Sequence, residues 1–365
     1  MIEFAGVTKQ YPDGTVAVDD LDLIVPDGNL VVFVGPSGCG KTTSMRMINR
    51  MIKPTSGTLT VNGEDVSKVD PVKLRLGIGY VIQSAGLMPH LRVIDNVATV
   101  PVLKGESRRS ARKAALGVLE RVGLDLKLAD RYPAQLSGGQ QQRVGVARAL
   151  AADPPILLMD EPFSAVDPVV REELQTEILR LQSELHKTIV FVTHDIEEAI
   201  KIGDTVAVFG RGGVLQQYDE PQRLLSNPAN DFVAGFIGAD RGYRGLQFRH
   251  ATGLPMHEIR ATDEAGVDAL ELGDGEWVLV TRPDGAPYAW IDGTGVALHR
   301  SGKSLYDSTT AGGSLFRPED SLRQALDAAL SSPSGLGVAV DAAGKPIGGV
   351  LADDVIDALK KQRAP

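Results

Sequence analysis

The sequence predicts an α/β fold followed by a smaller α+β domain. Short apolar runs at residues 31–34, 156–159 and 188–192 are too short for helices and fit buried parallel strands. Between the last two runs, residues 171–186 carry leucine and isoleucine at helical spacing, which gives a helix with one apolar face. Strands that alternate with helices are typical of an α/β core. Beyond about residue 240 the motifs stop and glycine, alanine and aspartate become frequent, which predicts a domain boundary.

The bulk composition limits the class of protein. The chain has 365 residues, 43% of them hydrophobic and 23% charged, which suits a globular protein with one large domain and one smaller domain. Its formal net charge of -9 argues against nucleic acid as a partner, because a face that binds phosphates would be basic. The single cysteine cannot form an intrachain disulfide, as expected in a reducing cytosol. We expect no signal peptide, and no stretch approaches the ~20 apolar residues that span a bilayer.

The run at residues 31–34 leads into a glycine-rich loop and then a predicted helix. The loop matches the phosphate-loop pattern G-x-x-x-x-G-K-[ST] and consists of Gly35, Pro36, Ser37, Gly38, Cys39, Gly40, Lys41, Thr42 and Thr43. Glycines let backbone N–H groups converge on phosphates, Lys41 should reach the β- and γ-phosphates, and Thr42 should ligate Mg²⁺. A glycine-rich turn could match by chance, but the preceding strand is the required context. We expect Cys39 to point away from the chemistry, a reactive thiol being the alternative.

A pair of carboxylates follows the apolar run at residues 156–159. An apolar strand that ends in two acidic residues reads as a Walker B strand, with Asp160 near Mg²⁺. Glu161 would then polarise the attacking water as a general base. A solvated acidic turn is the common alternative for such a pair alone, and the phosphate loop upstream argues against it.

A second glycine-bearing loop opens a predicted helix at residues 140–151. Its central residues are Ser137, Gly138, Gly139 and Gln140. Adjacent glycines and a serine hydroxyl at a helix N-terminus make an anion site, because free backbone N–H groups add to the positive end of the helix dipole. The polar segment at residues 107–122 is also helical and precedes this loop, so a separate helical subdomain is possible.

Two polar residues follow other predicted strands. His194 lies just past the run at residues 188–192, at the edge where open α/β sheets bind ligands. A lone histidine is more often structural, but here it could donate to a γ-phosphate. Gln83, after the run at residues 78–82, could reach Mg²⁺ or water, although alone it cannot be told from a surface glutamine.

From about Ile2 to Arg223 these motifs together resemble the ATP-binding cassette (ABC) ATPases. The family's motifs occur in order as Tyr11, residues 35–43, Gln83, residues 136–143, Asp160, Glu161, residues 164–167 and His194. The resemblance implies a P-loop NTPase core with antiparallel β and helical subdomains, and it implies binding and hydrolysis of ATP with Mg²⁺. Tyr11 would stack on the adenine. Val166 stands where the family usually has leucine, a mild departure.

The same resemblance implies an assembly. Two copies, or two closely related ABC subunits, would pack head to tail, with each ATP between the loop of Lys41 on one and Ser137, Gly138 and Gly139 on the other. The sequences at residues 80–83 and 160–165 look like bacterial import ATPases. Such a chain works with separate integral-membrane permease subunits and a substrate-binding protein. It would be peripheral, at the cytoplasmic face of the plasma membrane. The apolar stretch at residues 84–91 is either core or the groove that receives the permease.

Residues 230–242 resemble the corresponding segment of quaternary-amine importers, which take up glycine betaine, proline betaine, choline or carnitine. Importers of another solute, such as a sugar or polyamine, remain an alternative, and so does a non-transport ABC regulator. The solute itself cannot be read from this chain, because in this family the permease and binding protein choose it.

The tail carries a weak internal repeat. Residues 278–280 lead to residues 285–291, and residues 338–340 lead to residues 344–350, each as strand, polar turn and strand. A helix at residues 321–330 precedes the second copy, with Ser321 as its expected N-cap. The repeat resembles a degenerate pair of cystathionine-β-synthase (CBS) modules.

We therefore expect an ABC ATPase domain at residues 1–240 and a tandem CBS-like domain at residues 241–365. Residues 351–354 lack the hydroxyl that often holds a ribose in CBS modules, so nucleotide binding there is doubtful. Dimer contact, ionic-strength sensing or binding of another regulator are the open alternatives. The basic residues at 360–363 are best interpreted as a solvated C-terminal turn.

Overall fold

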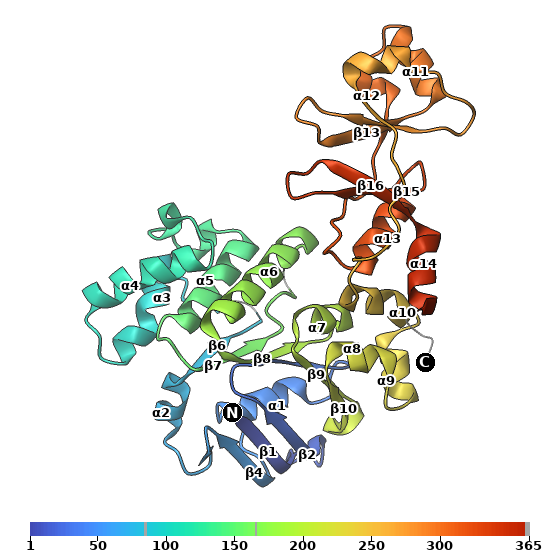
Figure 1. Ribbon diagram of the computed structural model, residues 1–365. Helices are drawn as coiled ribbons and strands as arrows, with labels where there is room; N and C mark the ends of the chain where they lie inside the picture. The colour runs from blue at the N-terminus through green and yellow to red at the C-terminus, as the bar shows by residue number, and fades with distance from the viewer. Residues whose placement is uncertain (84–85, 165, 362–365) are drawn as a thin grey trace. The chain divides into compact units, whose positions relative to one another are not determined.

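The computed structural model of the protein describes residues 1–83, 86–164 and 166–361 (Figure 1). The chain divides into two compact units, Met1–Ala239 and the residues from Asp240 onward. No helix among the residues so described is both long and apolar enough to cross a membrane.

The larger unit is built on a six-stranded sheet with the order β10-β9-β3-β8-β7-β6. Its strands are β3 (Leu30–Val34), β6 (Ile78–Val81), β7 (Ile156–Asp160), β8 (Thr188–Thr193), β9 (Thr205–Phe209) and β10 (Leu215–Asp219). All neighbours are parallel except β10, which pairs antiparallel with β9 at one edge. Every residue of β3, β7 and β8 is buried, which confirms the three apolar runs as central strands.

A second, antiparallel sheet has the order β2-β1-β4-β5. Its strands are β1 (Ile2–Gln10), β2 (Val16–Val25), β4 (Ser56–Val61) and β5 (Glu64–Asp65). One hydrophobic core joins the two sheets through α1 (Lys41–Ile48), because Phe4 and Leu21 pack in the same cluster as Met45 and Leu158. The family's expected antiparallel subdomain is therefore present.

Helices cover the parallel sheet and form a separate group on one side (Figure 1). They are α2 (Pro71–Leu76), α3 (Val93–Leu103), α4 (Arg108–Arg121), α5 (Gly138–Leu150), α6 (Pro168–Leu185), α7 (Ile196–Ile202), α8 (Pro221–Ser226) and α9 (Asp231–Ile237). The helices α3, α4 and α5 pack on one another, and α5 also contacts α6. The helix predicted at residues 107–122 is confirmed as α4, whose N-cap Ser107 accepts a hydrogen bond from the Ser110 N–H.

The helix predicted at residues 171–186 begins three residues earlier, as α6. Pro168 suits the first turn of a helix, where its missing N–H needs no partner. The carboxylate of Asp167 caps this turn by accepting from the Val170 N–H. The apolar period alone could not find this start, because Pro168 and Val169 are exposed and the first turn carries no fully buried residue.

The smaller unit holds two hairpins with helices packed against them. A four-stranded sheet has the order β11-β12-β13-β14, and β15 pairs with β16 in a separate two-stranded sheet. The elements are α10 (Arg241–Arg244), β11 (Ala261–Asp263), β12 (Val278–Thr281), β13 (Pro287–Ile291), α11 (Gly293–Arg300), α12 (Leu305–Ser308), β14 (Thr310–Ala311), α13 (Leu322–Ser331), β15 (Leu336–Val340), β16 (Pro346–Leu351) and α14 (Ala352–Lys361).

Both copies of the predicted repeat are antiparallel hairpins, β12 with β13 and β15 with β16. They pack on each other, since Leu279 and Trp290 share a buried cluster with Val338 and Val340. The predicted helix at residues 321–330 is α13, and Ser321 forms a capping box with Gln324.

Candidate functional site

The carboxyl ends of the parallel strands bring the predicted residues together. The phosphate loop follows β3, Asp160 ends β7 with Glu161 directly after it, and His194 follows β8. Gln83 lies two residues beyond β6. Because these strands are parallel neighbours, the loops after them meet at one edge of the sheet. The proximity of four distant motifs is therefore a consequence of the strand order.

The phosphate loop needs glycine where its backbone passes other segments closely. A Cβ on Gly35 would lie 2.3 Å from the Phe209 carbonyl oxygen, and one on Gly40 would lie 2.1 Å from the Ala17 carbonyl oxygen. Both glycines also have positive φ, at 154° and 92°. Ser37 and Gly38 are exposed at the tip of the loop, while Thr42 and Thr43 lie in the first turn of α1.

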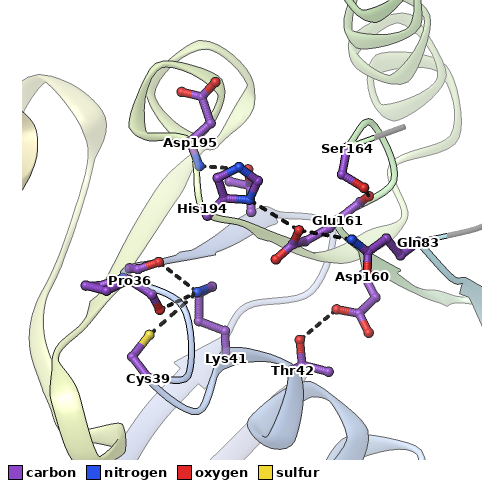
Figure 2. Close-up of polar contacts among 12 residues, drawn as sticks. Pro36, Cys39, Lys41, Thr42, Gln83, Asp160, Glu161, Ser164, His194 and Asp195 are labelled. Atoms are coloured by element: carbon purple, nitrogen blue, oxygen red, sulfur yellow. Dashed lines mark hydrogen bonds and ion pairs between the residues drawn. The ribbon is translucent and has the colours of Figure 1, made fainter. Parts of the chain in front are cut away.

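Lys41 is buried, and its ammonium is held by the loop itself. Its Nζ donates to the carbonyl oxygens of Gly35 at 2.7 Å and Pro36 at 3.0 Å (Figure 2). The Cys39 Sγ lies 3.6 Å from the same nitrogen, and that side chain is buried. Cys39 therefore points inward toward Lys41, which corrects the expectation that it points away from the chemistry. The inward direction fits the apolar character of a thiol, because Cys39 is packed in the hydrophobic core cluster of the larger unit.

Thr42 and Asp160 form a pair of oxygen ligands. The Thr42 hydroxyl donates to Asp160 Oδ1 at 2.8 Å, and Asp160 is only 5% exposed. On the other carboxylate oxygen, Oδ2, the Arg46 guanidinium lies at 3.3 Å and the Tyr80 hydroxyl at 3.4 Å. A buried carboxylate is costly unless it is paired and hydrogen-bonded, and these three groups provide that compensation.

This pair fits a Mg²⁺ ion. Mg²⁺ prefers hard oxygen ligands and is usually held by one or two protein groups together with phosphates and water. Within residues 1–83, 86–164 and 166–361, no group of three His, Cys, Asp or Glu side chains could hold a metal ion without such help. Thr42 and Asp160 thus have the chemistry of a site that is completed by a phosphate ligand.

Glu161 stands between two of the other predicted residues (Figure 2). Its Oε2 lies 3.2 Å from His194 Nδ1 and 3.5 Å from Gln83 Nε2. The residue has a left-handed backbone with φ 43°, and its N–H donates to the Val192 carbonyl of β8 at 2.9 Å. Such a conformation costs about 1–3 kcal/mol in a residue other than glycine and clusters at functional sites. Here it turns the carboxylate out of the strand direction and toward His194.

The second glycine loop opens a helix, α5, as predicted, and it lies apart from the loops at the carboxyl edge of the parallel sheet. Ser137 caps α5, accepting from the Gln140 N–H at 3.3 Å, while Gln140 Oε1 accepts from the Ser137 N–H at 3.0 Å. The helix begins at Gly138, two residues before the predicted start. Ser137 and Gly138 are exposed. In the described part of the chain, no hydrogen bond or ion pair joins residues 137–140 to the phosphate loop.

Tyr11 lies in the turn between β1 and β2. Its ring is about one-third exposed, and Lys9 Nζ lies 5.1 Å from the ring centroid. Its N–H donates to the Thr15 carbonyl, which closes the turn. The following strand β2 starts beside the phosphate loop, because Ala17 approaches Gly40 closely. The turn that carries the ring thus leads into the strand that packs against the phosphate loop.

Two expected segments lie partly outside the described residues. These are residues 84 and 85 of the apolar stretch and residue 165 of the turn after Glu161. Gln362 and Arg363 of the C-terminal basic cluster also lie outside the described residues. Of residues 86–91, none is buried, and the buried Asn96 side chain holds this segment by bonding to Met88 and Leu91. The core interpretation of this stretch is therefore wrong for the residues described. The Ser164 hydroxyl donates to the Glu161 carbonyl at 3.0 Å.

Four residues of this region were missed by the sequence analysis. Arg46 and Tyr80 bind Asp160, while Gln175 and Glu198 form a buried hydrogen bond, and Glu198 lines the same cavity as His194. Arg46 could have been found, because it lies one helical turn after Thr42. The others carry no local signal, since their partners are 80 and 23 residues away in the chain.

Comparison with known proteins is consistent with this site. The family model described as "ABC transporter" matches residues 18–164. A carnitine transport ATP-binding protein of Listeria monocytogenes is 52% identical over 241 residues, which cover 66% of this chain and 60% of that protein. This chain thus matches less than two-thirds of that relative's length. An osmoprotectant import ATP-binding protein of Salmonella typhimurium is 40% identical over 374 residues, covering 100% of this chain and 97% of that protein.

A solved structure resembles the larger unit. It is a dimeric ATP-binding cassette in a post-hydrolysis state, bound to ADP and phosphate. It is 35% identical in sequence, with a TM-score of 0.56, and the match covers 60% of this chain and 99% of that one.

Proposed function

Since this chain belongs to the ABC transporter family of ATP-binding proteins, we propose that it hydrolyses ATP to drive solute import through a separate permease. The observation that carries the proposal is the convergence of Glu161, His194 and Gln83 beside the Thr42–Asp160 pair. The named relatives favour glycine betaine, carnitine, choline or related osmoprotectants as the solute class. The 40% identity over the full chain supports this class more than a sugar or polyamine.

Each residue has a role that its position supports. Lys41 binds the β- and γ-phosphates when it leaves its two carbonyl partners, and the N–H groups of residues 35–43 surround them. Thr42, Asp160 and Gln83 would hold Mg²⁺, which neutralises charge that develops on the phosphates. Glu161 orients the attacking water and accepts its proton, and His194 donates to the γ-phosphate. The exposed ring of Tyr11 stacks on the adenine.

The site is completed by a second copy of the chain, or by a closely related ABC subunit. Ser137, Gly138, Gly139 and Gln140 are proposed to bind the γ-phosphate held by Lys41 of the other copy. The exposed N–H end of α5 suits an anion, and it makes no polar contact with the phosphate loop of its own chain within the described residues. The dimeric ADP-bound relative supports this arrangement.

The remaining partners follow from the proposed transport role. The permease would bind over residues 86–91, which are partly exposed and ordered by Asn96. A substrate-binding protein would deliver the solute on the other side of the membrane. The chain would then lie at the cytoplasmic face of the plasma membrane, held by the permease.

The smaller unit is proposed to be a tandem CBS-like domain over residues 241–365. Its two hairpins pack on each other through Trp290 and Val338, as the sequence repeat suggests. Asp354 at the start of α14 accepts from the Leu351 N–H and contacts His257 at 2.8 Å. Two features argue against ribose binding there. The Asp354 carboxylate already has partners within the chain, and residues 351–354 contain no hydroxyl side chain. A regulatory or dimer-contact role fits better.

The proposal is tested by Glu161→Gln in the full-length protein. We expect phosphate release from ATP to fall about 100-fold or more, because the variant cannot accept a proton from water. Nucleotide binding, measured by equilibrium titration, should change little. Glu120→Gln, on the exposed face of α4, is the matched control and should hydrolyse ATP as the wild type does. A Glu161→Gln variant with full activity would contradict the assignment.

A further inference from the structure

One helix, α6, touches both halves of the proposed ATP site in the same chain. On one side, Val170 lies against the second glycine loop, since a Cβ on Gly139 would stand only 2.4 Å from Val170 Cγ1. On the other side, α6 contacts the segment that carries His194. Val170 and Gln175 are five residues apart, about 7.5 Å along the helix and about 140° around it. The first two turns of α6 are therefore held between the two loops.

The contact with the His194 segment is polar and buried. Gln175 Nε2 donates to Glu198 Oε1 at 3.1 Å, and each of these residues is only 6% exposed. Glu198 lies in the first turn of α7, whose N-cap is Asp195. A seven-residue helix is marginal alone, so its position depends on such packing. The hydrogen bond thus fixes α7, and with it His194, to α6.

A second contact lies one turn earlier on α6. Arg171 Nη1 pairs with Asp195 Oδ2 at 4.0 Å, and the buried Nε of Arg171 has no hydrogen-bond partner within the described chain. Asp195 also accepts from the Glu197 and Glu198 N–H groups. A cavity of about 60 Å³ connects this cluster with the reacting groups, because Glu161, His194, Arg171 and Glu198 all line it. A shift of α6 would reach His194 directly.

We infer that Gln175 and Glu198 are positioning residues that couple the glycine loop at Gly139 to His194 through α6. This inference rests on the proposed function, in which that loop binds the ATP of one site and His194 serves the other. ATP bound against residues 137–139 displaces Val170, and the Gln175–Glu198 bond carries the displacement to His194. The result is cooperativity between the two ATP sites of a dimer.

The test compares ATP hydrolysis by full-length variants over a range of ATP concentrations. The wild type is expected to show a Hill coefficient above 1, with two sites setting the upper limit near 2. Gln175→Met and Glu198→Ala should bring the Hill coefficient close to 1 and lower kcat about 10-fold, because His194 is no longer held in position. Nucleotide affinity under non-hydrolysing conditions should stay within about two-fold.

Two further variants separate coupling from general damage. Glu198→Gln keeps an acceptor oxygen for Gln175, so it should restore most of the cooperativity. Lys201→Ala removes an exposed contact between α7 and α6, the 3.3 Å pair with Glu172, and should behave as the wild type. Thermal unfolding identifies any variant that fails to fold, and the comparison then rests on Gln175→Met.

Two results would overturn the coupling through α6, and a third would contradict the proposed ATPase function. Folded Gln175→Met and Glu198→Ala proteins with wild-type Hill coefficient and kcat would overturn the coupling. A wild-type Hill coefficient of 1 would also overturn it. A wild-type protein that binds ATP without hydrolysing it would instead count against the proposed function.

Discussion

At the scale of single residues, the site depends on carboxylates that are held in different ways. Asp160 is buried and bound by Thr42, Arg46 and Tyr80, so its orientation is set from both oxygens. Glu161, one residue later, leaves the strand through a left-handed turn, and its carboxylate contacts the His194 and Gln83 side chains of two other loops. The first arrangement suits a metal ligand, and the second suits a group that must reach a substrate.

Glu198, unlike Asp160 and Glu161, is a buried carboxylate whose side-chain partner is the neutral amide of Gln175. Burial raises the pKa of its carboxyl above the ordinary value of 4.5, because the charged form loses its hydration. A group with a raised pKa in the folded state contributes stability at pH below its unfolded pKa, and that contribution is lost as the pH rises through the folded pKa. The wild-type protein should therefore lose this contribution above about pH 4.5.

Glu198→Gln tests this effect, since glutamine keeps the hydrogen bond from Gln175 and cannot ionise. We expect the variant to gain stability relative to the wild type as the pH rises from about 4 to 8. The free energy of unfolding in urea, measured for both proteins across this range, provides the comparison. A difference that is constant with pH would show that the pKa of Glu198 is the same in the folded and unfolded protein, and one that grows toward acid would show that folding lowers it; either result would contradict the raised pKa.

At the scale of secondary-structure elements, the contact between α5 and α6 explains why residue 139 of the second glycine loop is a glycine. Gly138 is exposed. Gly139 is buried against Val170, and any larger residue there would have to displace the Val170 side chain. The need for glycine at position 139 therefore comes from packing against α6, which the sequence pattern alone does not reveal.

Gly139→Ala is expected to lower the free energy of unfolding by about 1–3 kcal/mol, because its methyl group overlaps Val170 Cγ1. Val170→Ala in the same chain should recover part of this loss by making room. Gly117→Ala is the control, since Gly117 lies within α4 with no atom within 4 Å of its Cβ position. That substitution should be neutral or slightly stabilising. Equal effects at both glycines in urea unfolding would refute the packing argument.

At the scale of the whole molecule, the proposed ATP site is divided between distant parts of the larger unit. The phosphate loop, Glu161 and His194 share one edge of the sheet, while Ser137 opens a helix of the separate group. A head-to-tail dimer would join these parts, each copy supplying one half. Because the site is divided in this way, the dimer arrangement can be tested by mixing two variants that are each inactive alone.

Lys41→Ala and Ser137→Arg are each expected to abolish hydrolysis, and Ser137→Arg should leave ATP binding largely intact. Mixing the two should restore phosphate release, because one site of each mixed dimer has both an intact Lys41 and an intact Ser137. Mixing Lys41→Ala with Glu161→Gln is the control, since both residues belong to the same half and no intact site can form. Absence of recovery in the first mixture, with mixed dimers demonstrated, would exclude the head-to-tail arrangement.

The strands of the larger unit could be predicted because their residues are apolar without interruption. Runs such as residues 31–34 and 188–192 signal burial on both faces, and the structure places them at the centre of the sheet. Helix starts were predicted less well, as for α6 and α5, because a first turn is determined by capping contacts and carries few core residues. The predicted direction of the Cys39 side chain was wrong because it depends on packing in the core, which the local sequence does not encode.

By itself, the sequence determined the family, the parallel strands and the identity of the phosphate-loop, carboxylate and histidine motifs. These features are local, since each depends on residue types and spacing within one short segment. Only the tertiary structure decided which motifs meet. The strand order brings Glu161 to His194 and Gln83. It also brings Tyr80 to Asp160, which is 80 residues away in the sequence. The helix α6 lies against both Gly139 and the segment that carries His194. Such contacts depend on packing between segments distant in the chain, and no single segment encodes them.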